Sequence, residues 1–196
     1  DLINIKVINK NYLFFIFFTS IFCLFFNFNY FYKFFYLFEI LFIFLILFNN
    51  KYKKIFFIIS VYIFWFILLY ISDVDRSLLY IIIFISFFND TIAYISGKLI
   101  KGPLILPSIS PKKTWSGTSI SFISSTIVLT IINFNIFMSM LLAISLFFGD
   151  IFFSYFKRLI NLKDFSSSMG NHGGILDRLD SMFFITILLQ IYLVLK

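Results

Sequence analysis

Long apolar runs separated by short charged segments limit what this chain can fold into. Each run is about 15 to 20 residues long, close to the length that a helix needs to cross a bilayer. Only 13% of the 196 residues are charged, about half the proportion of a soluble domain. The chain therefore has too little polar surface to cover a water-facing globule. We expect an all-α integral membrane protein, a polytopic bundle of roughly seven transmembrane helices in one domain, residues 1–196.

The apolar runs also give approximate helix boundaries. They cover residues 12–32, 34–49, 55–72, 78–96, 118–133, 136–156 and 181–195. The first run has no small-residue cleavage site after it, so we take it as a span rather than a signal segment. Residues 1–77 then form an N-terminal group of helices, and residues 78–196 form a second half with two polar loops, 97–117 and 157–180.

Basic residues predict which side of the membrane these two loops face. If the N-terminus is cytoplasmic and the helices alternate, 13 of the 16 Lys and Arg residues lie inside, as the positive-inside rule expects, and the others are Lys33, Arg76 and Lys196. The net charge of +7 is then a topology signal, so we expect no nucleic-acid partner. Both polar loops face the cytoplasm in this orientation, and a water-soluble substrate would be cytosolic.

Five of the nine acidic residues lie in or beside the two loops: Asp90, Asp150, Asp164, Asp177 and Asp180. Asp90 and Asp150 fall within apolar runs, where a carboxylate is costly and usually faces a cavity that serves ion, proton or substrate chemistry. A structural acid paired with a nearby Lys or Arg is the alternative for either one. Two such acids, each leading to a basic loop, favour a function.

A polar stripe follows one face of the helix expected at 136–156. Asp150, Ser154, Lys157 and Arg158 are spaced i, i+4, i+7 and i+8, which places them on one side of a helix. Lys and Arg often extend toward water from a helix end without any function. A buried Asp one to two turns before them makes a functional stripe the better interpretation.

Asp177 and Asp180 are spaced i, i+3 at the start of the last expected helix, with Arg178 beside them. Acids there can simply complement the helix dipole. Facing Asp150 across a cleft, they would instead form a hard-oxygen site suited to Mg²⁺. The His-Gly-Gly triplet at 172–174 could bring backbone amides close to a phosphate, although a histidine in such a triplet is commonly only a loop residue.

The other loop contains Ser-Pro-Lys-Lys-Thr-Trp-Ser-Gly at residues 110–117. Two lysines with hydroxyls and a glycine suit the binding of a polyphosphate. Anionic lipid headgroups attract the same kind of loop, and Trp is common at membrane interfaces. Taken alone, this motif does not decide between the two.

Together these segments resemble the phosphatidate cytidylyltransferases (CDP-diacylglycerol synthases). Residues 154–180, SYFKRLINLKDFSSSMGNHGGILDRLD, are similar to that family's signature at every charged and glycine position, with Met169 as a mild departure. The segments 89–97, NDTIAYISG, and 110–117 also look like family motifs in the same order. The resemblance covers about residues 85–195, and family members usually carry more N-terminal membrane helices.

The resemblance implies a reaction in which CTP and phosphatidic acid give CDP-diacylglycerol and pyrophosphate with Mg²⁺. It implies a multi-pass protein of the cell inner membrane whose active site lies in the half 78–196, at the cytoplasmic face. A second, monovalent cation and a homodimer are left open. The rival reading is a cation-coupled transporter that uses Asp90 and Asp150 as a relay. A CDP-alcohol phosphotransferase is disfavoured because the chain has no Asp-Gly dipeptide.

The resemblance also implies roles for individual residues. Asp150 and Asp177 would ligate Mg²⁺, and Asp180 and Asp164 would support them or hold a second cation. The residues expected to act on the reacting phosphates are Asp150, Lys157, Arg158, Asp177, Arg178 and His172. The residues expected to bind substrate are Asn89, Asp90, Ser110, Lys112, Lys113, Thr114, Ser154, Lys163, Gly173 and Gly174.

Overall fold

The computed structural model describes residues 35–48, 53–162, 164–165, 176–177 and 179–195. The described helices and strands are α2 (Phe35–Phe48), α3 (Lys53–Val74), α4 (Arg76–Ile100), β1 (Leu104–Leu106), β2 (Ser110–Thr114), α5 (Trp115–Ile131), α6 (Ile136–Leu159) and α7 (Met182–Leu195). These helices lie within about four residues of six expected spans. The expected span 12–32 lies outside the described residues.

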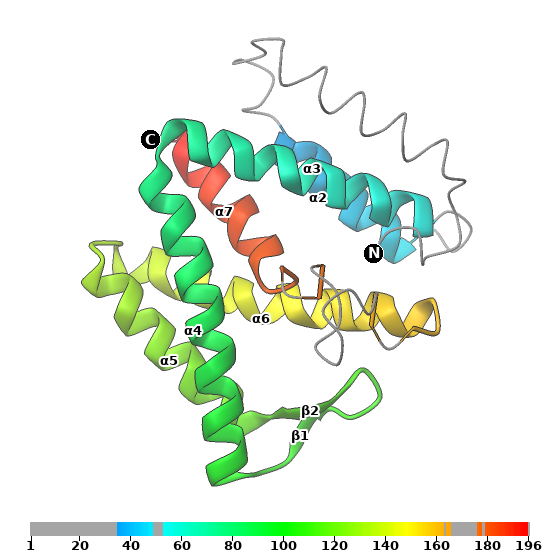
Figure 1. The fold of residues 1–196 in the computed structure, drawn as a ribbon, viewed down its shortest axis with the longest axis vertical. Coiled ribbons are helices and arrows are strands. Elements are labelled where there is room, and N and C mark those ends of the chain that lie inside the picture. Colours follow the sequence, from blue (N-terminus) through cyan, green and yellow to red (C-terminus); the bar gives the residue numbers. More distant parts are fainter. Residues whose placement is uncertain (1–34, 49–52, 163, 166–175, 178, 196) are drawn as a thin grey trace.

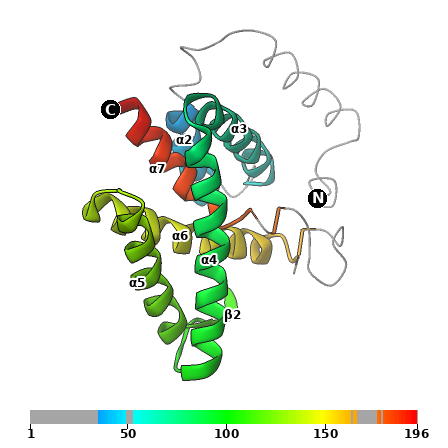
Figure 2. The ribbon, with the colours of Figure 1, turned by 60° about the vertical axis from the view of Figure 1, so that its left-hand side comes forward.

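Helix α4 is the longest of the described helices, and α3, α5 and α7 all contact it. In both views α3 and α7 lie at one end of α4, with α2 packed on α3 and α7, while α5 and the β1–β2 hairpin lie along its other end (Figures 1 and 2). Helix α6 runs across the middle and contacts both α5 and α7. The centre of the molecule is therefore where α4, α6 and the start of α7 meet.

Three of the described helices are long and apolar enough to cross a membrane: Lys54–Val74, Arg76–Ile100 and Ile136–Leu159. The other described helices are apolar but shorter. Large apolar side chains are exposed along the helices, for example Phe84, Ile127 and Phe148, each more than half exposed. Such exposure is costly in water and suits contact with lipid, which supports the expected helical membrane protein.

Side-chain caps fix where several helices begin. The Asp75 carboxylate accepts from the Ser77 backbone N–H at 2.9 Å and separates α3 from α4. Thr114 caps α5 by accepting from the Gly117 N–H at 3.2 Å, and Asn135 caps α6. Capping oxygens satisfy backbone donors that have no partner in the first turn. Because Thr114 is also the last residue of β2, the strand passes directly into α5.

The β1–β2 hairpin is a departure from the all-α expectation, and it lies in the segment 97–117 that was expected to be a polar loop. Its antiparallel register pairs Leu104 with Thr114 and Leu106 with Ser110. The chain leaves α4 through Lys101 and Gly102, whose φ angles are 59° and 133°. Strands of three and five residues, one of them containing a proline, are too short to show the alternating pattern by which a strand is recognised.

A phenylalanine cluster forms the core between α3, α6 and α7. All its members are at most 7% exposed, and they are Phe57 and Phe64 of α3, Phe152, Phe153 and Phe156 of α6, Phe165, and Phe183 of α7. Their ring centroids lie 3.8 to 6.5 Å apart for the contacting pairs. These are distances at which aromatic pairs stabilise one another beyond simple burial.

Candidate active site

A cavity of about 370 Å³ lies where α4, α5, α6 and strand β2 meet. Part of its lining is polar and consists of Asn89, Asp90, Lys112, Lys113, Thr114 and Asp150, together with hydroxyl residues of α5. Much of the remainder is apolar and includes Phe122, Ala143, Ile144 and Phe147. The fold thus brings Asp150 together with residues from the two separate motifs at 89–97 and 110–117.

Close contact between α4 and α5 places those two motifs side by side. A Cβ atom on Gly117 would lie 2.5 Å from the Ala93 carbonyl oxygen and 3.2 Å from Gly97 Cα. A Cβ atom on Gly97 would lie 2.8 Å from the Thr114 hydroxyl oxygen. The helices can approach this closely only because both positions lack a side chain.

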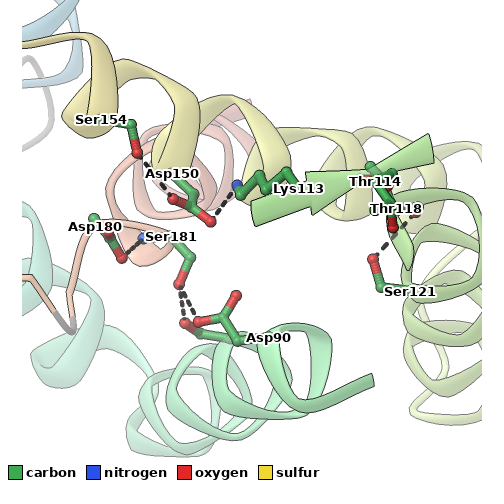
Figure 3. A network of polar contacts seen from close by, with 10 residues as sticks. Asp90, Lys113, Thr114, Thr118, Ser121, Asp150, Ser154, Asp180 and Ser181 are labelled. Carbon is green, nitrogen blue, oxygen red and sulfur yellow. Dashed lines mark hydrogen bonds and ion pairs between the residues drawn. The ribbon is translucent and has the colours of Figure 1, made fainter. Parts of the chain in front are cut away.

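Asp150 and Lys113 form an ion pair at the edge of the cavity (Figure 3). Both side chains are 24% exposed. Ser154, one turn further along α6, donates to Asp150 Oδ1 at 3.5 Å, and Lys113 Nζ lies 5.5 Å from the centre of the Phe147 ring. The β1–β2 hairpin therefore places Lys113 against Asp150, the α6 carboxylate that the sequence identified as a candidate.

Two buried serines connect α4 with the start of α7. The hydroxyl oxygens of Ser86 and Ser181 lie 2.5 Å apart, and Ser181 Oγ donates to Asp90 Oδ2 at 3.4 Å. Since the Ser181 proton is used for Asp90, the Ser86 hydroxyl is the donor to Ser181. Figure 3 shows Ser181 pointing toward Asp90. Asp90 is therefore held by a side chain from the far end of the sequence.

Helix α6 touches the backbone of that same segment at Gly149. A Cβ atom on Gly149 would lie 2.5 Å from the Asp180 carbonyl oxygen and 3.0 Å from that of Ser181. The Asp180 carboxylate accepts from the Ser181 N–H at 2.8 Å. Asp150 follows Gly149 directly, so this contact fixes Asp180 beside it.

The centre of the site gathers more carboxyl groups than lysines. Burial raises the pKa of the Asp180 carboxyl well above its ordinary value, and the nearby charges of Asp150 and Asp90 raise it further, against two lysines. Of the four carboxyl groups described in this region, Asp150 and Asp177 form ion pairs with Lys113 and Lys157, whereas Asp90 and Asp180 have no described ion pair. Crowded carboxyl groups in a buried site are relieved either by protonation or by an additional cation.

The donor chemistry of these carboxylates fits Mg²⁺, which prefers oxygen ligands. Among the described residues, however, no three His, Cys, Asp or Glu side chains are arranged as a metal site. Lys113 forms an ion pair with Oδ2 of Asp150, and Lys157 Nζ donates to Asp177 Oδ1 at 2.9 Å. A divalent cation would therefore compete with these lysines for the carboxylate oxygens.

Asp177 lies in a different environment from Asp180. Its second oxygen, Oδ2, accepts from the Phe165 backbone N–H at 3.0 Å, so Asp177 joins Lys157 to the loop. Both acids precede α7, which begins at Met182 and has no acid in its first turn. Asp177 lies five residues before α7 and so does not complement the dipole of that helix, whereas for Asp180, which accepts from the Ser181 N–H, this alternative stays open. Of the two, Asp180 is the one that the Gly149 contact places beside Asp150.

Three further expected residues lie away from the cavity lining. Arg158 donates from Nε to the Ile109 carbonyl oxygen at 3.2 Å and so connects α6 with the hairpin turn. Ser110 begins β2 and is partly buried, and Asp164 is exposed. Their expected roles stay predictions. Lys163, His172, Gly173, Gly174 and Arg178 lie outside the described residues.

The entire chain, residues 1–196, matches the model of the cytidylyltransferase family. The chain belongs to this family. It is 37% identical over 146 residues to a phosphatidate cytidylyltransferase of Rickettsia conorii, covering 65% of this chain and 64% of that relative. It is 32% identical over 142 residues to the Aquifex aeolicus protein of the same name, covering 69% and 54%. The match to the Staphylococcus saprophyticus protein is 40% over 116 residues, covering 54% and 45%.

The chain thus spans about half to two-thirds of the length of these relatives. The family match agrees with the resemblance seen in the motifs. It gives no support to the cation-coupled transporter.

Sequence reasoning missed several small residues that organise the site. Ser86, Ser181 and Gly149 bring α4, α6 and the start of α7 together, and Ser125 of α5 donates to Asn89 Oδ1 at 3.2 Å. The available signal was the presence of small or hydroxyl residues within otherwise apolar helices. Such residues let membrane helices approach closely and hydrogen-bond to one another.

Proposed function

We propose that this chain is a phosphatidate cytidylyltransferase. It transfers CMP from CTP to phosphatidic acid and releases pyrophosphate, which supplies CDP-diacylglycerol for phospholipid synthesis. A phosphate oxygen of phosphatidic acid attacks the α-phosphorus of CTP, and the bond from that phosphorus to the bridging oxygen of the β-phosphate breaks. The attacking oxygen is already ionised at neutral pH, so the reaction depends on charge neutralisation and alignment more than on a general base.

The observation that carries this proposal is the cavity in which the Lys112–Lys113–Thr114 segment meets Asp90 and Asp150 among apolar helices. A site with cationic, anionic and apolar parts suits a reaction that joins a nucleotide to a lipid. The relatives named phosphatidate cytidylyltransferase support the same substrates.

Different residues of the chain bind the triphosphate of CTP and the phosphate of phosphatidic acid. Lys112, Lys113 and Thr114 hold the triphosphate from the hairpin side, and Asn89 helps to bind the nucleotide. Lys157 attracts the phosphate of phosphatidic acid from the other end of the α6 stripe, seven residues from Asp150. This arrangement presents the two anions from opposite directions, as an in-line displacement requires.

Mg²⁺ held by Asp150 and its neighbouring carboxylates would neutralise the triphosphate and the departing pyrophosphate. Asp180 is the described carboxyl group best placed to assist Asp150, and a cation would relieve the crowding of carboxyl groups there. We further propose that the site faces the cytoplasm at the inner membrane, with the N-terminus on the same side. A homodimer and a second, monovalent cation belong to the same proposal.

The test is the conversion of radiolabelled CTP and phosphatidic acid to CDP-diacylglycerol by the purified chain. Product should form with Mg²⁺ and disappear with EDTA. Asp150→Asn should reduce turnover by at least about 10²-fold, since it removes charge from the position where the reacting phosphates meet. Asp73→Asn makes the same chemical change at an exposed position of α3, away from the cavity, and should retain activity.

Absence of product from well-folded protein in lipid would contradict the proposed function. Wild-type turnover and Mg²⁺ dependence in Asp150→Asn would contradict the metal assignment alone.

A further inference from the structure

We infer that Phe57 of α3 is a positioning residue, which acts through Phe165 to hold the Lys157–Asp177 pair in place. Phe57 lies in the N-terminal group of helices, outside the segments that resemble family motifs. The inference about substrate rests on the proposed function, whereas the inference about the loop does not.

The Phe57 ring connects α3 with α6 and with Phe165. Phe57 is fully buried, and its ring is stacked on that of Phe156 with centroids 3.8 Å apart and planes 11° apart. It is also stacked on Phe165, with centroids 5.4 Å apart and planes 17° apart. Phe57 thus contacts α6 immediately before Lys157, and it contacts the loop at Phe165.

Phe165 lies where it can hold the Lys157–Asp177 pair in place. Its ring is fully buried, and its backbone N–H donates to Asp177 Oδ2 at 3.0 Å. Lys157 Nζ donates to the other oxygen of Asp177 and lies 5.6 Å from the centre of the Phe165 ring. One residue therefore contacts both members of the pair, by a hydrogen bond to the acid and by a cation–π contact to the lysine.

Aromatic packing is a strong constraint on Phe165. Phe165 is connected to helices α3 and α6 by its ring, and Phe153 adds an edge contact at 6.0 Å. Replacing the Phe57 ring by a smaller aliphatic group would leave Phe165 free to shift. The amide that Asp177 accepts from would shift with it, and Lys157 would lose its fixed direction.

The experiment compares Phe57→Leu with Phe64→Leu in the full chain. Phe64 is a matched control because it lies two turns further along α3, is only 2% exposed, and packs on Phe183 of α7 at 5.5 Å. The first readout is hydrogen–deuterium exchange of the peptide that contains Phe165. Phe57→Leu should speed exchange there, and Phe64→Leu should leave it near the wild-type rate.

The second readout is steady-state kinetics. Phe57→Leu should raise KM for phosphatidic acid about 3- to 10-fold, as expected for the loss of an aromatic pair. KM for CTP should change little, because the triphosphate is held from the hairpin side. Phe64→Leu should leave both KM values near those of the wild type.

A double variant shows whether Phe57 acts through Phe165. If it does, Phe57→Leu should raise the KM for phosphatidic acid little further when Phe165 is already leucine, whereas independent effects of the two substitutions would multiply. Unchanged exchange in Phe57→Leu, or equal effects of the Phe57 and Phe64 variants, would overturn the inference. If the wild type makes no CDP-diacylglycerol, the proposed function fails, and the exchange data still decide whether Phe57 orders the loop.

Discussion

Replacing Gly149 with alanine should damage the site while leaving every charged residue in place. The new Cβ would lie 2.5 Å from the Asp180 carbonyl oxygen and 3.0 Å from the Ser181 carbonyl oxygen. Both obstacles are backbone atoms, so no side-chain rotation can relieve the contact. Either α6 or the segment before α7 must move.

The size of the displacement follows from the contact distance. Ordinary contacts of a Cβ atom begin at about 3.4 Å, so the 2.5 Å contact requires a shift of about 0.9 Å. Overpacking of this kind typically costs about 1–3 kcal/mol of stability. A misplacement of about 1 Å in an active site can reduce the rate about 10²-fold. Because Gly149 precedes Asp150 and touches Asp180, we expect a loss of turnover near that value.

The assay is CDP-diacylglycerol formation in detergent–lipid micelles, with the thermal unfolding of each variant measured in parallel. Ser139→Ala is the control, since Ser139 is also buried on α6 but lies more than two turns before Gly149. The control should retain turnover. A Gly149→Ala protein with wild-type turnover and unfolding temperature would refute the close backbone contact and the role assigned to it.

Two further substitutions test contacts around the cavity. Ser181→Ala removes the hydrogen bond to Asp90 and the acceptor of the Ser86 hydroxyl. It should lower turnover about 5- to 10-fold, because one buried hydrogen bond contributes about 1 kcal/mol. Unchanged turnover would argue against positioning of Asp90 by Ser181. Gly117→Ala places a Cβ 2.5 Å from the Ala93 carbonyl oxygen and should separate α4 from α5. Its unfolding temperature should fall and its KM for CTP should rise, and a KM equal to that of the wild type would contradict the contact.

The helices could be predicted from the sequence because the hydropathy of an apolar run is a redundant signal. Every residue of an apolar run contributes to it, so an error at one position moves a boundary by only a few residues. The expected spans 34–49 and 181–195 differ by one residue at most from either end of α2 and α7. The β1–β2 hairpin lacked such redundancy, because its strands depend on a few backbone pairs and on the turn that leaves α4.

The charged residues of the site were predictable for a related reason. A carboxylate within an apolar helix is costly, so Asp90 and Asp150 stood out without any knowledge of the fold. Their partners could not be identified in the same way. Ser181 and Phe57 belong to common residue types, and their importance depends on what lies opposite them.

The two ion pairs of the site differ in burial, and this difference decides how substitutions there should be interpreted. The Lys113 and Asp150 side chains are each 24% exposed, whereas those of Lys157 and Asp177 are 11% and 7% exposed. Removing one partner of a buried pair strands the other charge and can cost about 3–5 kcal/mol. An inactive Asp177 variant therefore combines lost chemistry with lost folding, unless Lys157 is neutralised with it. At Asp150 water can solvate the lysine left behind, so lost activity in a stable Asp150→Asn protein reports more directly on the reaction.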